Sequence, residues 1–283
     1  MVNAFKTEQG RQVVYNRYKE ILASWPVKNK QYFISTSIGA TFIVESGQDD
    51  HPPLILLHGS VSNSFTWFTD VVELGKKFKV FAVDLIGDAG LSEMVRPGYK
   101  SGAYEQWLHE LMGALRLESA HFAGISLGGW MAINFGVHFP EMVRSMFLIS
   151  PGGLSKVRSS FLWKLLLYSL TGNKRKIFIL LNGGKDIGLS HELGAAMAFT
   201  VLINKHFKPR TDELPVFERE ELAQLTMPVM LVFGARDCIF NADQSVRFLT
   251  ETAKHAEAFV YPDAGHIIVN QSEKMIDFFE KYF

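Results

Sequence analysis

Short runs of β-branched and aromatic residues alternate along the chain with longer amphipathic stretches. Six such runs, at 54–58, 79–84, 119–126, 144–150, 228–234 and 257–263, predict strands. Their near-continuous apolarity is typical of strands that helices cover on both faces, so we expect a mainly parallel sheet. Residues 32–47, with Gly39 at the centre, predict an antiparallel hairpin at the sheet edge. The pattern therefore predicts an α/β fold with eight strands.

Helical periodicity occurs ahead of the hairpin and in one long interval without a strand. Before the hairpin, one apolar helical stripe carries Val14, Tyr18, Ile21, Leu22 and Trp25, and we expect this helix to lie over the domain or its cap. After Pro151, helical patterns occupy 159–171, 174–182 and 190–206. We therefore predict a helical cap inserted after the sixth strand. The predicted boundaries are a core domain of residues 1–151 and 223–283 and a cap of residues 152–222.

Composition narrows the classes of function. A chain of 283 residues that is 47% hydrophobic can bury a large core, and its 29 basic and 29 acidic residues cancel, which gives no electrostatic reason to expect nucleic acid. The most apolar stretch, 161–170, is interrupted by Lys164 and is too short to span a bilayer, so no stable membrane insertion is expected. The N-terminus lacks the apolar core of a signal peptide, and the single Cys238 cannot form an internal disulfide, so a cytoplasmic location is expected. A small-molecule ligand is consistent with the balanced charge of the chain. The oligomeric state stays open.

Small residues surround a single serine in the stretch FAGISLGGWMA, residues 122–132. Ser126 falls between a predicted strand and a predicted helix, within Gly124-Ile125-Ser126-Leu127-Gly128. A side chain lifted out at such a turn requires a strained backbone at the serine and almost no bulk two residues to either side, which the two glycines satisfy. The bare pattern also arises by chance, but its position between strand and helix favours a nucleophile.

A serine hydroxyl becomes an effective nucleophile only when a base takes its proton, and that base needs an orienting acid. Ligands of parallel α/β sheets bind at the carboxyl ends of the strands, so both partners should follow late strands. Asp237 follows the penultimate predicted strand and His266 follows the last one. We therefore predict Ser126 as nucleophile, His266 as general base and Asp237 as orienting acid.

Competing residues are less well placed in the chain. His58 also ends a predicted strand, but it precedes the serine, which favours a structural role. Asp263 and Asp243 are the alternatives for the acid. No further histidine or carboxylate cluster has the spacing of metal ligands, so we predict no metal, no cofactor and activity that persists in EDTA.

Acyl transfer also needs hydrogen-bond donors for the oxyanion that develops. The backbone N–H of Leu127, at the start of the predicted helix, is one expected donor, and the helix dipole assists it. His58-Gly59 allows a sharp turn after the strand at 54–58, so the N–H of Ser60 is the second expected donor, with Val61 as the alternative.

The segments LLHGS, AVDLIGD, GISLGG, FGARD and DAGH together resemble the α/β-hydrolase superfamily, in the right order and over nearly the whole chain. SWPV, FISTSIGATFIVESG, AVDLIGD and GISLGGWMAINF are similar to the bacterial carboxylesterases that cleave aryl-propionate esters, the carboxylesterase NP or naproxen esterase group. That resemblance implies a four-helix cap over the site, esterase activity and no cofactor. The Asp-x-x-Gly-x-Gly-x-Ser segment of the superfamily carries an extra residue here, over 84–92, and Asp88 within it receives no role.

The residues and the resemblance together predict a serine hydrolase that cleaves carboxylic esters through an acyl-enzyme. Carbon–carbon bond hydrolases, lactonases, thioesterases and perhydrolases use the same triad and stay open, as does a ligand-sensing signalling module with an intact triad.

The predicted cap carries more large apolar residues than three short helices can bury among themselves. They are Phe161, Leu162, Trp163, Leu165, Leu166, Tyr168, Ile177, Phe178, Leu181, Met197, Phe199, Leu202 and Phe207. We expect the inner face of the cap to form a pocket for bulky, aromatic acyl groups. The alternative is that all of these residues pack on the sheet domain.

Overall fold

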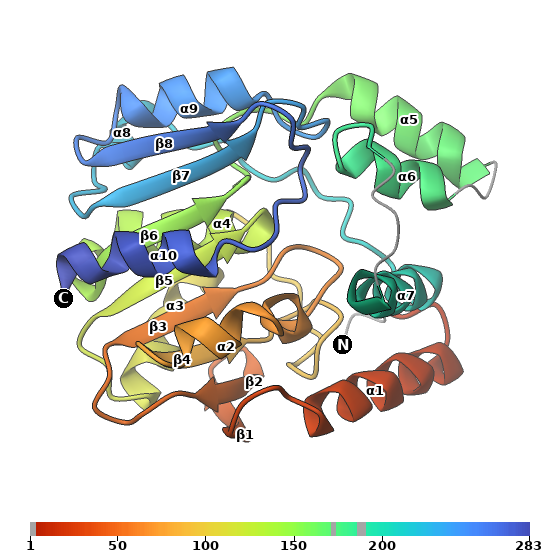
Figure 1. The fold of residues 1–283 in the computed structure, drawn as a ribbon, viewed down its shortest axis with the longest axis horizontal. Helices are drawn as coiled ribbons and strands as arrows, with labels where there is room; N and C mark the ends of the chain where they lie inside the picture. The colour runs from red at the N-terminus through yellow and green to blue at the C-terminus, as the bar shows by residue number, and fades with distance from the viewer. Residues whose placement is uncertain (1–3, 171–173, 186–190) are drawn as a thin grey trace.

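A single eight-stranded sheet forms the centre of the computed structural model, which describes residues 4–170, 174–185 and 191–283 (Figure 1). The strands are β1 (Asn29–Thr36), β2 (Gly39–Ser46), β3 (Pro53–Leu57), β4 (Lys79–Val83), β5 (Ala120–Ile125), β6 (Val143–Ile149), β7 (Val229–Gly234) and β8 (Ala256–Tyr261). They lie in the order β1-β2-β4-β3-β5-β6-β7-β8. Strand β2 pairs antiparallel with both neighbours, and the remaining pairs are parallel. The predicted α/β sheet and its edge hairpin are confirmed.

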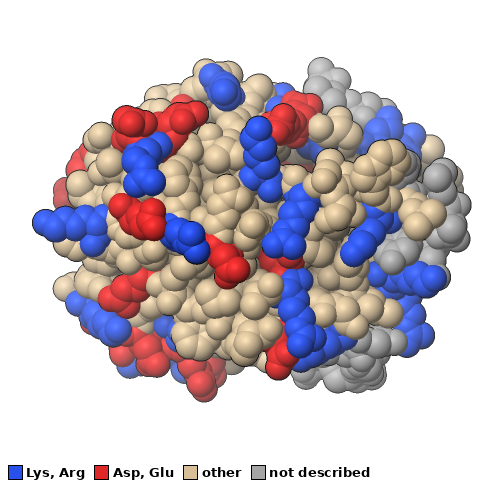
Figure 2. Space-filling model, turned by 90° about the horizontal axis from the view of Figure 1, so that it is seen from above, with Lys and Arg blue, Asp and Glu red and all other residues tan. Residues whose placement is uncertain are grey.

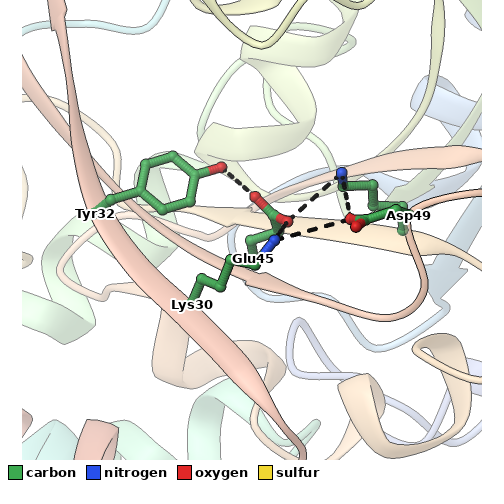
Figure 3. Close-up of polar contacts among 5 residues, drawn as sticks. Lys30, Tyr32, Glu45 and Asp49 are labelled. Carbon is green, nitrogen blue, oxygen red and sulfur yellow. Dashed lines mark hydrogen bonds and ion pairs between the residues drawn. The ribbon is translucent and has the colours of Figure 1, made fainter.

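A polar cluster fixes the register of the hairpin against the rest of the sheet (Figure 3). The Glu45 carboxylate on β2 accepts hydrogen bonds from Tyr32 Oη at 2.6 Å and from Lys30 Nζ at 3.2 Å, both on β1. Lys79 of β4 lies 3.6 Å from the same carboxylate and 2.9 Å from Asp49. Partial burial by itself would raise the pKa of Glu45, but the bonds from Tyr32 and Lys30 hold it below its ordinary value. One carboxylate thus links three strands.

Helices cover both faces of the sheet. The α-helices are α1 (Glu8–Ala23), α2 (Asp70–Leu74), α3 (Ala103–Ala114), α4 (Leu127–His138), α5 (Ser159–Leu170), α6 (Lys174–Leu181), α7 (His191–His206), α8 (Arg219–Leu222), α9 (Ala242–Thr250) and α10 (Ser272–Phe279). Short 3₁₀ helices occur at η1 (Ser64–Trp67), η2 (Pro140–Met142) and η3 (Glu280–Tyr282). Alternate residues of β3 face opposite cores: Ile55 packs with α3 and α4, whereas Leu56 packs with α1, α2 and α10. A sheet with two apolar faces needs both helical layers.

The last strand departs from the expectation of strands buried on both faces. Glu257, Ala258 and Phe259 of β8 are exposed, because β8 is an edge of the sheet and α9 reaches it from one side. The prediction of burial is therefore wrong for this strand. The apolar composition of this run is typical of a central strand, which is why the sequence predicted burial.

Helices α5, α6 and α7 lie beyond the ends to which the parallel strands point; α5 packs on α6, whereas α7 packs on α1 (Figure 1). Their bounds confirm the three helical patterns predicted between Pro151 and 206. An isolated antiparallel β-bridge between Phe5 and Phe207 joins the end of α7 to the segment before α1. In it, Lys6 N–H donates to His206 O at 2.8 Å and Lys208 N–H donates to Ala4 O at 2.7 Å. The first helix therefore lies over both the sheet domain and α7.

The large apolar residues of this segment divide between buried and exposed positions. Phe199 and Phe207 are buried against the first helix, whereas Leu162 and Trp163 are exposed. The side chains of Leu165, Leu166 and Tyr168 lie outside the described part. In the described residues, no helix is long and apolar enough to cross a membrane.

Candidate active site

Ser126 stands at the tight turn from β5 into α4. Its φ of 52° and ψ of −109° lie in a region that residues other than glycine rarely adopt. Hydrogen bonds hold the turn on both sides: Ser126 N–H donates to Ile149 O at 3.0 Å, and Ser126 O accepts from Gly152 N–H at 3.1 Å. The backbone of β6 and of the loop that follows it therefore supports the strained serine.

The glycines around Ser126 let α4 approach the sheet closely. A Cβ added to Gly124 would lie 2.6 Å from Gly128 O, and a Cβ added to Gly128 would clash with the carbonyl oxygens of Leu57 and His58. No side chain fits at either position without moving backbone. This agrees with the steric requirement that the sequence predicted.

The structure brings together the three residues that the sequence singled out. His266 Nε2 lies 3.1 Å from Ser126 Oγ, and His266 Nδ1 lies 2.8 Å from Asp237 Oδ2. The other carboxylate oxygen of Asp237 accepts the N–H groups of Ile239 and Phe240 at 2.7 and 3.0 Å. Since an ionised carboxylate can only accept, His266 donates from Nδ1 and turns the lone pair of Nε2 toward the serine hydroxyl.

The competing histidine has other partners, and the competing carboxylates are exposed. His58 Nε2 accepts the Leu85 N–H at 2.9 Å, so its Nδ1 carries the proton and donates to Gly59 O at 2.7 Å. Both of its ring nitrogens are used on backbone, as the structural interpretation of His58 expects. Asp263 is exposed and pairs with Arg236 at 2.6 Å, and Asp243 is exposed on the first turn of α9.

The two predicted oxyanion donors belong to segments that lie next to the serine. Leu127 begins α4, so its N–H belongs to the first turn, where helical N–H groups have no intrahelical acceptor. Gly59 lies against the serine, since a Cβ added to it would be 3.6 Å from Ser126 Cβ. Ser60 and Val61 follow directly, and Val61 has a φ of 59°, which is rare for a β-branched residue.

Two buried carboxylates hold the loop that contains Ser60 and Val61. Asp84 Oδ1 accepts the Ser64 N–H at 2.8 Å, the Ser64 hydroxyl at 2.7 Å and the Tyr18 hydroxyl at 2.9 Å. Asp88 Oδ1 accepts the Ser62 N–H at 3.2 Å. Burial raises the pKa of Asp88, although the N–H groups of Ala89 and Ser62, which it accepts, oppose the shift. Sequence reasoning missed Asp84 and left Asp88 without a role; two carboxylates just after a buried strand are the signal for such an anchor.

The helical segment after β6 reaches both loops of the triad. Ile267 N–H, next to His266, donates to Leu181 O of α6 at 3.2 Å, and Arg158 N–H donates to Ile239 O in the Asp237 loop at 2.8 Å. The described residues contain no group of three or more His, Cys, Asp or Glu side chains that could hold a metal ion.

Comparison with known proteins agrees with this architecture. The sequence profile described as the alpha/beta hydrolase family matches residues 54–279. The uncharacterized carboxylesterase nap of Bacillus subtilis is 30% identical over 261 residues, which cover 90% of this chain and 86% of that protein. Carboxylesterase YbfK of the same organism is 28% identical over 259 residues, covering 90% and 87%. The crystal structure of naproxen esterase (carboxylesterase NP) from Bacillus subtilis has a TM-score of 0.81 at 28% identity and covers 98% of each chain.

Proposed function

Because the chain belongs to the alpha/beta hydrolase family, we propose that it cleaves carboxylic esters through an acyl-enzyme intermediate on Ser126. The observation that carries this proposal is the hydrogen-bonded series from Ser126 through His266 to the buried Asp237, on a strained turn. Two relatives that each match 90% of the chain, and the solved structure of naproxen esterase, are carboxylesterases by name, which supports an ester as the substrate.

In the acylation step, His266 Nε2 takes the proton of the Ser126 hydroxyl while Oγ attacks the ester carbonyl carbon. The tetrahedral intermediate collapses when the imidazolium returns that proton to the departing alkoxide, which leaves as the alcohol. Water then attacks the acyl-enzyme with the same histidine as base, and the acid leaves with Ser126 restored. Asp237 stays ionised throughout and stabilises the imidazolium.

The oxyanion of each tetrahedral intermediate would accept from Leu127 N–H and from the N–H of Ser60, with Val61 as the alternative. One such donor is worth about 3 kcal/mol of transition-state stabilisation in other serine hydrolases. Backbone donors on an anchored loop suit this task, because they need no reorganisation as charge develops. The anchors Asp84 and Asp88 support this assignment.

Residues 152–222 would act as the cap over this site. Their contacts with the Asp237 and His266 loops support such a position, and their many apolar residues support a bulky or aromatic acyl group. An extra methylene accepted in such a pocket changes kcat/KM by up to about 1–3 kcal/mol. A naphthyl- or phenyl-propionate ester should therefore be cleaved faster than the acetate of the same alcohol.

The catalytic assignment is tested with p-nitrophenyl esters and a fluorophosphonate probe. Ser126→Ala should abolish labelling, and both it and His266→Ala should lower kcat by on the order of 10³-fold or more. Asp237→Asn should be nearly as severe, because the imidazolium loses its counter-charge. The exposed His255→Ala is the matched control and should leave both readouts unchanged.

Three results would contradict parts of this proposal. Ser126→Ala that keeps more than about a tenth of the activity would reject the nucleophile. Labelling of the wild type with negligible turnover of every ester would instead indicate a ligand-sensing module. Equal or faster acetate turnover would mean that the cap does not select the acyl group.

A further inference from the structure

Helix α5 carries an exposed apolar face beside the proposed cap. Leu162, Trp163 and Leu167 expose 54%, 71% and 56% of their surface. Trp163 and Leu167 are four residues apart, so their side chains lie on one side of the helix. We name these three residues the α5 patch.

The chain around the α5 patch is strongly basic. Residues 152–185 contain no aspartate or glutamate, although the whole protein has equal numbers of acidic and basic residues. Their cations are Lys156, Arg158, Lys164, Lys174, Arg175, Lys176 and Lys185. All of these except Lys174, whose side chain is not described, are exposed, and Lys185 also lies 3.9 Å from Asp263. Toward the right edge of Figure 2, where α5 and α6 lie, the described charged side chains are Lys and Arg.

Two other exposed aromatic side chains in the described part of the chain do not combine these properties. Phe33 packs on Phe42 within the hairpin with the two rings tilted by 57°, and Phe259 lies under the Lys274 ammonium with Glu257 two residues away. Isolated exposed apolar residues are normal for a folded protein. The α5 patch differs because its three residues lie on one helix and the charged residues of the surrounding segment, 152–185, are all basic.

The α5 patch also lies near the proposed active site. The helix begins directly after Arg158, whose N–H donates to Ile239 O in the Asp237 loop, and α5 packs on α6, which contacts the His266 loop. A surface bound by α5 would therefore lie close to the triad.

We propose that α5 docks this protein reversibly onto an anionic lipid–water interface. The α5 patch enters the interfacial layer, where Trp is favoured, and the surrounding cations face the lipid phosphates. Charge complementarity selects this partner, because a second copy of the chain would bring the same cations against each other. Docking would present the site to esters that dissolve in the lipid phase.

Tryptophan fluorescence gives a specific readout of this docking. The protein has five tryptophans, and Trp25, Trp67, Trp107 and Trp130 are at most 7% exposed, which leaves Trp163 as the exposed one. Vesicles of phosphatidylcholine with 30% phosphatidylglycerol should shift its emission to the blue, and brominated lipids should quench it. Binding should weaken at least about tenfold with neutral vesicles and again on raising the salt from 0.1 to 0.5 M.

Vesicle co-sedimentation compares matched variants on the full chain. Leu162→Ser/Trp163→Ser and Lys156→Gln/Lys164→Gln should each lower the partition coefficient about tenfold or more. The controls are Phe33→Ser, for an apolar residue of equal exposure, and Lys19→Gln/Lys28→Gln, for exposed charge on another face. Far-ultraviolet circular dichroism verifies that each variant is folded.

Equal binding to neutral and anionic vesicles, or wild-type binding by both α5 variants, would overturn the proposal. A concentration-dependent dimer that Leu162→Ser/Trp163→Ser abolishes, without vesicle binding, would also overturn it and assign the face to self-association. The binding assays involve no turnover, so their failure leaves the proposed esterase activity untouched.

Discussion

At the scale of single residues, the strained turn at Ser126 depends on the absence of side chains around it. Gly128→Ala would push a methyl group into the carbonyl oxygens of Leu57 and His58, so α4 would have to move away from β3. We expect the variant to lose several kcal/mol of unfolding free energy, as overpacked cores do at about 1–3 kcal/mol or more, and most ester turnover. Urea unfolding and p-nitrophenyl ester hydrolysis measure the two effects.

Substitution of a second glycine by alanine should have the opposite effect on stability. Gly113 lies in α3 with open space where a Cβ would be added, so Gly113→Ala should raise the unfolding free energy by about 0.5–1 kcal/mol and leave turnover unchanged. If the two alanine variants had equal stability, close packing would not be the reason for glycine at 128.

The sequence could predict residues whose placement follows from their position directly after a strand. Ser126, Asp237 and His266 each follow a strand, and parallel strands bring their carboxyl ends together regardless of detail. Asp84 and Tyr18 were beyond reach, because their hydrogen bond joins residues 66 positions apart on elements whose relative placement no local pattern contains. Tyr18 was recognised only as part of an apolar stripe.

At the scale of elements, Tyr18 joins α1, α7 and the loop beside the active site. Its ring stacks on Phe199 of α7 with centroids 6.0 Å apart, and Phe65 of η1 packs edgewise on the same phenylalanine. Its hydroxyl donates to Asp84, which also holds Ser64 at the start of η1. One aromatic group thus connects the proposed cap to the loop with the proposed oxyanion donors.

Tyr18→Phe keeps the ring and removes only the hydroxyl. Because the bond goes to a buried carboxylate, its loss should lower the unfolding free energy by about 1.5–3 kcal/mol. We also expect kcat to fall more than KM changes, since the loop position matters most in the transition state. Urea unfolding and steady-state kinetics measure these effects, with Tyr282→Phe at the C-terminus as the control. A variant that loses stability with unchanged kcat would limit Tyr18 to a structural role.

Helices and strands were predictable as elements, but their surroundings were not. The bounds of α5, α6 and α7 follow the periodicity closely, yet Trp163 of α5 is exposed while Phe199 of α7 is buried. Both residues belong to apolar stretches. Their exposure differs because α1 covers α7 but does not cover α5. The exposed face of β8 has the same origin, because position at a sheet edge is a property of the assembled fold.

At the scale of the whole molecule, a buried histidine and a partly buried aspartate respond to acid in opposite directions. His121 of β5 is fully buried, with Nδ1 2.8 Å from Ser145 Oγ and its ring against Phe279. Burial, assisted by Arg144, lowers its pKa from 6.5 to about 4. The unfolded chain therefore takes up this proton first, and the stability that the neutral imidazole provides above pH 6.5 is lost as the pH falls toward 4.

Asp70, at the start of α2, has the reverse effect. Burial raises its pKa from 3.8 to about 6, although the backbone N–H groups of Gln271 and Ser272 oppose the shift. The folded protein therefore takes up this proton before the unfolded chain does. Its contribution to stability is present below pH 4 and is lost as the pH rises through 6.

The contributions of His121 and Asp70 to stability change in opposite directions between pH 4 and 6 and partly cancel. A variant that lacks one of the two groups should therefore show the pH dependence of the other. Relative to the wild type, His121→Phe/Ser145→Ala should gain up to about 3 kcal/mol of unfolding free energy as the pH falls from 7 to 4, since 1 pKa unit equals 1.36 kcal/mol. The double substitution avoids leaving the buried Ser145 hydroxyl without the imidazole. Asp70→Asn should instead gain relative to the wild type as the pH rises from 4 to 7. Urea unfolding followed by circular dichroism at pH 4, 5.5 and 7 measures all three proteins. If the differences in unfolding free energy between each variant and the wild type did not vary with pH, neither His121 nor Asp70 would have the shifted pKa that its burial requires.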